Sequence, residues 1–241
     1  MPAAKYEDIY QGLRADIEAG VYPKELPPEH TLSEQYGCSR NTVRRATARL
    51  AEEGYVQSVH GRGVFVLHQR PEQTEFMICG VESMKEAAAR NHLQVRTKLI
   101  YFTELVVDEA LRDLTGFPEG AEIYCLRRVR YLDGTALIVD HNYFLKSVVR
   151  GLTPTIAEAS VYDYMENVLK ETIVTTQRKF TVDLATDLDR EYLDLGAYNS
   201  LVVVSGRTFN ADGIQFEYTQ SRHRPDRFVF YGQVRRMKPG R

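Results

Sequence analysis

The chain has 241 residues, of which 43% are hydrophobic, and its formal net charge at pH 7 is −2. This length suits one large domain or a small domain joined to a larger one, and the hydrophobic fraction is ordinary for a packed core. The mild acidity excludes a protein that is basic throughout, so any contact with nucleic acid must come from a local patch. No apolar run is long enough for a membrane span, and the N-terminal MPAAKYEDIY has no signal-peptide core. We therefore expect a cytoplasmic protein.

The three cysteines, Cys38, Cys79 and Cys125, lie far apart in the sequence. Their spacing fits neither a zinc site nor a disulfide framework. We expect buried, reduced thiols and no bound metal, as is usual in the cytoplasm.

The N-terminal part predicts three helices. Apolar side chains recur at helical spacing over residues 6–19, and Gly20 is suited to end that helix. A Pro-rich turn leads to a short second helix over residues 31–36. Ser39 then caps a third helix, which Gly54 ends.

Two short strands follow the helices. Residues 55–59 and 64–68 alternate in polarity around the glycine-bearing turn HGRG. A helix pair followed by a hairpin is the plan of a winged helix-turn-helix, whose second helix enters the major groove of DNA while the hairpin contacts the backbone. We therefore predict a DNA-binding domain over residues 1–68 and a polar linker over residues 69–75.

The third helix concentrates positive charge. Residues 39–50, SRNTVRRATARL, contain four arginines and no acidic residue. Because the apolar residues of this helix face the core, Arg40, Arg44 and Arg45 point outward, where arginine binds phosphate or pairs with guanine. A solvated basic face is the alternative for such a helix taken alone. The cap, the helix pair and Arg62 at the hairpin tip favour DNA binding.

From residue 76 onward, longer strands alternate with helices. Strands are expected at residues 95–102, 123–132, 136–144, 177–185, 201–209, 214–222 and 227–235. Helices are expected at residues 83–91, 107–116, 161–170 and 187–196. Tight turns at residues 133–135 and 211–213 favour antiparallel neighbours. The pattern predicts an α+β domain over residues 76–241 on a mixed, largely antiparallel sheet.

Two features of this second domain suit a phosphorylated ligand. Ser83 and Glu86 have capping-box spacing, which exposes N–H groups at a helix start, and Lys85 adds positive charge there. Arg128 and Arg130 lie two residues apart on one predicted strand and so share a face, where both can converge on one phosphate. The alternatives are a solvent-facing ladder of salt bridges and an ordinary helix cap.

Residues 26–66 resemble the DNA-binding domain of the GntR family of bacterial transcription regulators. The matching motifs are the entry LPPE, the recognition helix SRNTVR, LAEEG and the wing GRGVFV. Pro28 replaces the serine of the family's entry motif, which removes one hydroxyl contact at the start of the second helix. The resemblance implies that DNA is contacted by Arg40, Thr42, Arg44, Arg45, Arg62 and Gly63.

The second domain resembles the HutC branch of that family, whose sensor, the UTRA domain, has a chorismate-lyase-like fold. Residues 128–140, 189–196 and 216–230 carry this resemblance. The last of these segments, together with residues 81–88, is most similar to repressors of trehalose operons, which sense trehalose 6-phosphate. The resemblance implies that the effector is bound by Ser83, Lys85, Arg128, Arg130, Asp140, Arg178, Glu217 and His223.

Within that set, the resemblance assigns the phosphate to Ser83, Arg128 and Arg130. Asp140 and Glu217 are suited to sugar hydroxyls. His223 stands where relatives often have tyrosine, and the spacing around Arg178 is loose.

The implied function is repression of a sugar-utilisation operon by a homodimer that releases a palindromic operator when the sugar phosphate binds. Its half-sites would lie about one helical turn, ~34 Å, apart. The same architecture with an amino-sugar phosphate, a fatty acid or urocanate as effector is one alternative, and a chorismate-lyase-like enzyme is another. Because the sequence has no paired acid-base motif, metal-ligand spacing or phosphate loop, we expect no enzyme activity and no cofactor.

Overall fold

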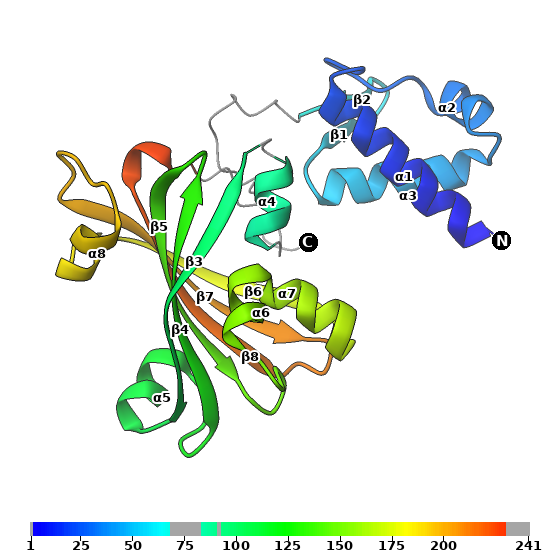
Figure 1. Cartoon of the computed structure of the whole chain (residues 1–241). Helices are drawn as coiled ribbons and strands as arrows, with labels where there is room; N and C mark the ends of the chain where they lie inside the picture. Colours follow the sequence, from blue (N-terminus) through cyan, green and yellow to red (C-terminus); the bar gives the residue numbers. More distant parts are fainter. Residues whose placement is uncertain (1, 68–82, 91–92, 230–241) are drawn as a thin grey trace, which may run out of the picture. The chain divides into compact units, whose positions relative to one another are not determined.

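The computed structural model describes residues 2–67, 83–90 and 93–229, which fold as two compact units (Figure 1). The first lies within residues 2–67 and the second within the remaining described residues. The predicted linker over residues 69–75 and Cys79 lie outside the described residues. No helix in the described part of the chain is long and apolar enough to cross a membrane.

The first unit contains three helices and a hairpin. Its elements are α1 (Pro2–Ala19), α2 (Glu29–Gln35), α3 (Arg40–Glu52), β1 (Val56–Val59) and β2 (Gly63–Val66). The predicted cap of α3 is confirmed, because the Ser39 hydroxyl accepts a hydrogen bond of 3.2 Å from the backbone N–H of Thr42. Helix α2 begins two residues before the predicted start, and Pro28 at its N-cap provides no side-chain hydrogen bond.

The core of this unit lies among the three helices and β1. Its fully buried side chains are Ile9, Tyr10, Leu13, Ile17, Leu26, Leu32, Val43, Ala46, Leu50 and Val56. Those of α1 and α3 recur at helical spacing, so each helix turns one face inward. The opposite, exposed face of α3 carries its arginines.

The second unit is built on a six-stranded sheet (Figure 1). Its strands are β3 (Val95–Val106), β4 (Glu122–Leu132), β5 (Thr135–Leu145), β6 (Ile173–Leu184), β7 (Ser200–Asn210) and β8 (Gln215–His223). Their order is β3-β4-β5-β8-β7-β6, and each of these neighbouring pairs is antiparallel. The predicted α+β domain on a largely antiparallel sheet is therefore confirmed, and the described strands contain no parallel pair that would make the sheet mixed.

Short helices cover both faces of this sheet. They are α4 (Met84–Arg90), α5 (Glu109–Thr115), α6 (Pro154–Ala159), α7 (Val161–Tyr164) and α8 (Asp187–Tyr192). Helices α4, α6 and α7 lie on one face, and α5 and α8 on the other (Figure 1). The predicted helix over residues 161–170 is α7 continued by a π-helix, Met165–Leu169, that ends at Lys170 with φ 59°.

The described part of the last predicted strand, residues 227–235, is not a strand. Pro225–Arg227 form a 3₁₀-helix, and residues 228–229 have no regular structure. Pro225 fixes its own φ and donates no N–H, and Arg224 pairs with Asp226 at 2.7 Å. Both effects stabilise a local turn and disfavour hydrogen bonding to a neighbouring strand. The rest of that prediction lies outside the described residues.

The turn between β4 and β5 and a register shift beside it together set the pairing that the cavity described below needs. Asp133 and Gly134 have φ values of 48° and 82°, as a two-residue hairpin turn requires. After the turn, Tyr131 lies opposite Ala136, and a shift between Arg130 and Tyr131 then places Arg130 opposite Ile138 and Arg128 opposite Asp140. The face that carries the two arginines therefore also carries an acidic side chain of the next strand.

Candidate ligand cavity and nucleic-acid interface

A cavity of about 380 Å³ lies on the sheet face that α4, α6 and α7 cover. All six strands contribute side chains to its lining. The lining includes all eight residues assigned to the effector above: Ser83, Lys85, Arg128, Arg130, Asp140, Arg178, Glu217 and His223. Residues from five separate segments of the sequence are thus brought to one place.

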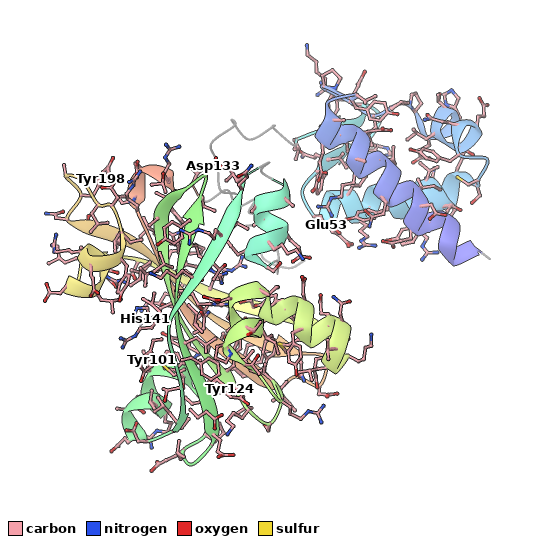
Figure 2. All side chains as sticks on the ribbon, in the orientation of Figure 1. Glu53, Tyr101, Tyr124, Asp133, His141 and Tyr198 are labelled. Atoms are coloured by element: carbon pink, nitrogen blue, oxygen red, sulfur yellow. The ribbon has the colours of Figure 1, made fainter. Side chains whose placement is uncertain are left out.

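The two-residue period of the strands explains which side chains enter the cavity. On β8, Glu217 and Ser221 face it, and on β5, Asp140 and Asn142 do. The register pairs Asp140 with Ser221, so side chains of adjacent strands meet on this face. His141, the intervening residue on β5, does not line the cavity, and Figure 2 shows its side chain on the side of the sheet away from α6 and α7.

Arg130 forms a buried ion pair in the cavity wall. Its Nε donates to Asp140 Oδ2 at 2.7 Å, and its Nη1 donates to the Thr97 hydroxyl at 2.6 Å. The Ser221 hydroxyl donates to the other carboxylate oxygen at 2.6 Å. Burial acts to raise the pKa of Asp140, but the charges of Arg130 and Arg128 outweigh it, so the pKa lies below its ordinary value. Asp140 is therefore ionised at neutral pH.

Arg128 is equally buried but has neutral partners. Its Nε and Nη2 donate to Asn142 Oδ1 at 3.1 and 2.9 Å, and its Nη1 donates to the carbonyl oxygen of Ala157 in α6 at 3.1 Å. Burial and the charge of Arg130 lower the pKa of Arg128 to about 9, although Asp140 and Glu217 act in the opposite direction. No carboxylate of the described residues forms an ion pair with this guanidinium. Since both arginines are under 10% exposed, the alternative interpretation as a solvent-facing ladder of salt bridges is wrong.

Glu217 is a buried hydrogen-bond acceptor at the centre of a polar network. It accepts from the hydroxyls of Tyr162 and Thr208 at 2.7 and 3.1 Å and from the Asn142 amide at 3.3 Å. Burial raises the pKa of this carboxyl group, although the hydrogen bonds and Arg128 act against it. The network links β5, β7 and β8 to α7 and so holds the cavity together.

Helix α4 contributes both of the residues predicted at its start. The Ser83 hydroxyl accepts from Glu86 N at 3.2 Å, and Glu86 Oε2 accepts from Ser83 N at 2.7 Å, which confirms the capping box. Lys85 Nζ lies 2.6 Å from Asp163 Oδ2 of α7, and the lysine side chain is 67% exposed. Ser83 is thus an ordinary cap and part of the cavity lining at once.

His223 is a buried, neutral residue of the cavity. Burial lowers its pKa to about 4, although Asp140 acts in the opposite direction. Its ring centroid lies 4.9 Å from that of Phe228.

Sequence reasoning missed much of the polar lining. The additional polar residues are Thr97, Asn142, Glu158, Ser160, Tyr162, Thr176, Thr208, Thr219 and Ser221. Those on β5, β6 and β8 stand at two-residue steps from residues that were identified, so alternation could have found them, whereas Thr97 on β3 and Thr208 on β7 share no strand with an identified residue. Glu158 lies on α6, which was not predicted, and strand alternation does not apply to Ser160 and Tyr162 at the start of α7.

The first unit presents its arginines on the outer face of α3. Arg40, Arg44 and Arg45 are all exposed. Arg44 Nε lies 2.9 Å from both carboxylate oxygens of Glu29, yet its side chain remains 65% exposed. Arg45 lies 4.7 Å from the ring centroid of Tyr6. Exposed pairs of this kind contribute at most about 1 kcal/mol, so phosphate can replace them.

The hairpin brings a further cation to the turn between β1 and β2. Arg62 is exposed and stacks 5.7 Å from the ring centroid of Phe65. Gly61 and Gly63 flank it with φ values of 72° and 120°, which favour glycine. A Cβ on Gly63 would meet nothing closer than Glu25 at 4.0 Å, so conformation and not space requires this glycine. The hydroxyl oxygen of Thr42, on the first turn of α3, lies 2.8 Å from the hydroxyl oxygen of Ser39.

Comparison with known proteins agrees with this division. Residues 5–66 match the family model "Bacterial regulatory proteins, gntR family", and residues 90–229 match the UTRA domain. The chain is 37% identical over 240 residues to the HTH-type transcriptional regulator TreR of Bacillus subtilis (strain 168), an alignment that covers 99% of this chain and 100% of the relative.

Two solved structures are also similar. The effector binding domain of the B. subtilis trehalose repressor (TreR) is 36% identical, with a TM-score of 0.53, and the alignment covers 59% of this chain and 99% of that one. The possible transcriptional regulator YydK of B. subtilis is 22% identical with a TM-score of 0.82, over 96% of this chain and 99% of that one, and so shows the same fold. The chain belongs to the GntR family of bacterial transcription regulators and carries a C-terminal UTRA domain.

Proposed function

We propose that this regulator is a homodimeric repressor of a sugar-utilisation operon, and that a phosphorylated sugar, trehalose 6-phosphate, releases it from its operator. The observation that carries the proposal is Arg128, a buried cation of the cavity whose described partners are an amide and a carbonyl oxygen. The similarity to the trehalose repressor TreR and to its effector binding domain supports the sugar.

The cavity has the chemistry of a sugar phosphate site. A phosphate dianion supplies the negatively charged partner that Arg128 does not have among the described residues. Ser83 and Lys85 offer further hydrogen-bond donors at the start of α4. Asp140 and Glu217 provide acceptors for sugar hydroxyls on the same face. The volume of about 380 Å³ lies within the usual range of small-molecule sites, roughly 300–1,000 Å³.

On DNA, α3 lies in the major groove and the hairpin contacts the backbone. Two subunits read a palindrome with half-sites about one helical turn, ~34 Å, apart. A regulator of this kind works at the chromosome, so we place it in the cytoplasm. Ligand release requires that trehalose 6-phosphate bind the DNA-free form more tightly, typically by about 1–3 kcal/mol.

A thermal-shift panel tests the ligand. Trehalose 6-phosphate should raise the melting temperature, because a ligand at 100 times its dissociation constant adds about 2.7 kcal/mol of stability. Unphosphorylated trehalose at the same concentration is the matched control and should produce no comparable shift. Glucosamine 6-phosphate, a fatty acid and urocanate complete the panel. A shift by one of these three in place of trehalose 6-phosphate would refute the assignment.

The same panel, applied to protein bound to operator DNA, tests the direction of the response. Trehalose 6-phosphate should lower the fraction of DNA bound, measured by fluorescence anisotropy. Tighter binding in its presence would exclude release as the mechanism.

A further inference from the structure

The sheet face away from the cavity is covered by the described helices only at its two ends (Figure 1). At one end, Leu111 of α5 packs in an apolar cluster with Ile123, and at the other end Leu188 of α8 packs in a cluster with Val129. Between the two clusters, cross-strand pairing aligns one side chain from each strand. This outer row consists of Tyr101, Arg127, His141, Gln220, Ser205 and Lys179.

The outer row is cationic and has no acidic member. Arg127 lies near one end and Lys179 at the other, and Arg207 lies two residues from Ser205 on β7, in the next row toward α5. That next row contains no acidic residue either. None of the three cations forms an ion pair with a described acidic residue. In a chain with a net charge of −2, this is a local concentration of positive charge.

Two of these cations are held in place by their surroundings. The guanidinium of Arg207 lies against Gly116, the left-handed C-cap of α5, where a Cβ would stand 3.0 Å from Arg207 Cζ. Arg127 lies 5.1 Å from the ring centroid of Tyr101. Side chains fixed in this way lose less conformational freedom when a partner binds. The two guanidiniums are therefore ordered before any anionic partner arrives.

The tyrosines around the outer row argue against nucleic acid as that partner. Single-stranded nucleic acid binds by stacking successive bases on exposed aromatic rings. The ring centroids of Tyr143 and Tyr218 lie 6.1 Å apart, so the rings pack against each other, and Tyr218 is only 7% exposed. Tyr101 is 43% exposed, which leaves one well-exposed ring among these three. A polypeptide needs no such stacking platform.

The spacing of the charges fits an extended acidic polypeptide. Arg127 and Lys179 stand four strands apart in one row, which corresponds to ~19 Å, and about six residues of extended chain span this distance. Gln220 and Ser205 lie between them and offer hydrogen-bond donors and acceptors to a peptide backbone.

Acidic side chains on the two helices restrict the direction of such a segment. Asp113 of α5 and Glu191 of α8 are exposed on helices at opposite ends of this face. A path along the strands would bring an acidic segment toward one of these carboxylates, and like charges repel. A path across the strands follows the outer row and avoids both helices.

We propose that the outer row binds an extended acidic segment of another protein, laid across the strands with one acidic group at Arg127 and another at Arg207 and Lys179. The partner occupies a face that the proposed repressor function leaves unused, and its binding does not depend on the identity of the effector. Because exposed ion pairs are weak and are screened by salt, the affinity should be modest and should fall as salt is added.

Fluorescence anisotropy of labelled peptides with the full-length chain tests the proposal. The probe is an octapeptide with two glutamates at each end and serine and glycine between them. An octapeptide of the same composition with its four glutamates in the middle is the matched control. The probe should bind about fivefold more tightly, because only its charges reach both ends of the outer row. Equal affinities, or no measurable binding of the probe, would overturn the proposal.

Variants at the two ends of the outer row locate the binding. Arg127→Gln and Lys179→Gln should each raise the dissociation constant of the probe about fivefold, and the double variant about 25-fold, since distant sites act additively. Arg127→Lys keeps the charge and should stay near the wild-type value. Arg150→Gln, which changes an exposed arginine outside the row, is the control and should have no effect.

Thermal melts of each variant verify folding, and the fully exposed Lys179 keeps the test valid if Arg127→Gln does not fold. A folded double variant with an unchanged dissociation constant would rule out the outer row as the binding site.

Two further measurements separate this site from the DNA-binding unit. Arg44→Ala should leave the affinity for the probe unchanged, and a loss there would place the peptide on α3 instead. A labelled single-stranded pentadeoxynucleotide, whose four phosphates match the charge of the probe, should bind the Arg44→Ala protein more weakly than the probe does. If it bound more tightly and Arg127→Gln and Lys179→Gln weakened it, the partner would be a nucleic acid and the proposal would be wrong.

Discussion

Arg128 and Arg130 stand two residues apart on β4, yet their surroundings differ. Arg130 pairs with Asp140 at 2.7 Å, whereas Arg128 has only an amide oxygen and a carbonyl oxygen as its described hydrogen-bond acceptors. The pKa of Arg128, lowered to about 9 by burial, still leaves it charged at neutral pH. An anion that binds beside Arg128 therefore gains more electrostatic free energy than an anion that binds beside Arg130. Arg130 therefore orients Asp140, and under the proposed function Arg128 is the residue that attracts the phosphate.

His223 should make the stability of the protein depend on pH. Its pKa is about 4 in the folded chain and about 6.5 when unfolded, so between these values the unfolded chain binds more protons. The free energy of unfolding should therefore fall as pH is lowered from about 6.5 to about 4, by up to about 3 kcal/mol from this residue. Urea denaturation across this range measures the slope.

The matched variant is His223→Gln, which is neutral at every pH. It should reduce the slope in that window while leaving changes below pH 4 in place; His141, whose pKa burial also lowers, continues to contribute there. An identical slope in the variant would show that other groups cause the acid sensitivity.

The sequence predicts that Arg128 and Arg130 share a face, because this follows from the two-residue period of a strand alone. It does not predict which of them has a counter-ion. That depends on Asp140 and Asn142 of the next strand, whose register is set by the two-residue turn and by the register shift beside it. It also depends on the carbonyl of Ala157 in a helix that was not predicted. Contacts between distant segments decide the electrostatics of each arginine.

At the scale of elements, periodicity predicts the long strands and helices well and the short helices poorly. The strand expected at residues 123–132 occurs as β4, because 11 residues of continuous pattern leave little ambiguity. Helix α6 has only 6 residues, too few for a periodic signal, although Thr153 caps it and Pro154 begins it. The local turn at Pro225 likewise overrides a strand-like composition. Short elements depend on packing against the sheet, which one segment does not reveal.

The cap of α3 should control both stability and DNA binding. Ser39→Ala removes the hydrogen bond to the Thr42 N–H and should lower the free energy of unfolding of the first unit by about 1 kcal/mol. Because α3 carries the arginines, operator affinity should fall as well. Ser39→Asn keeps a capping side chain and should retain both properties; thermal melts and anisotropy titrations measure them. If Ser39→Ala and Ser39→Asn lost stability and operator affinity equally, the loss of the cap would not be the cause of the change.

At the scale of the whole molecule, the proposed DNA-binding and ligand-binding functions belong to separate compact units and should be separable by mutation. Arg44→Ala removes an exposed cation of α3 and should abolish operator binding at physiological salt while leaving the trehalose 6-phosphate shift unchanged. Arg128→Met removes the cavity cation without leaving a carboxylate unpaired, and should keep operator binding but lose release by the ligand.

Arg112→Ala, an exposed change on α5, is the control for both variants and should alter neither property. If Arg128→Met protein still left the operator normally with trehalose 6-phosphate, the phosphate would have to bind elsewhere. If the Arg44→Ala protein lost the rise in melting temperature caused by trehalose 6-phosphate, DNA binding and ligand binding would not be independent properties of the two units.

The unpaired charge of Arg128 also bears on how the protein should be handled at the bench. A buried guanidinium with neutral acceptors attracts any small oxyanion that fits, and sulfate and inorganic phosphate are common components of buffers and crystallisation solutions. In such solutions we expect the cavity to be partly filled before any sugar is added. Chloride and an amine buffer are therefore the reference conditions in which free and ligand-bound protein can be compared.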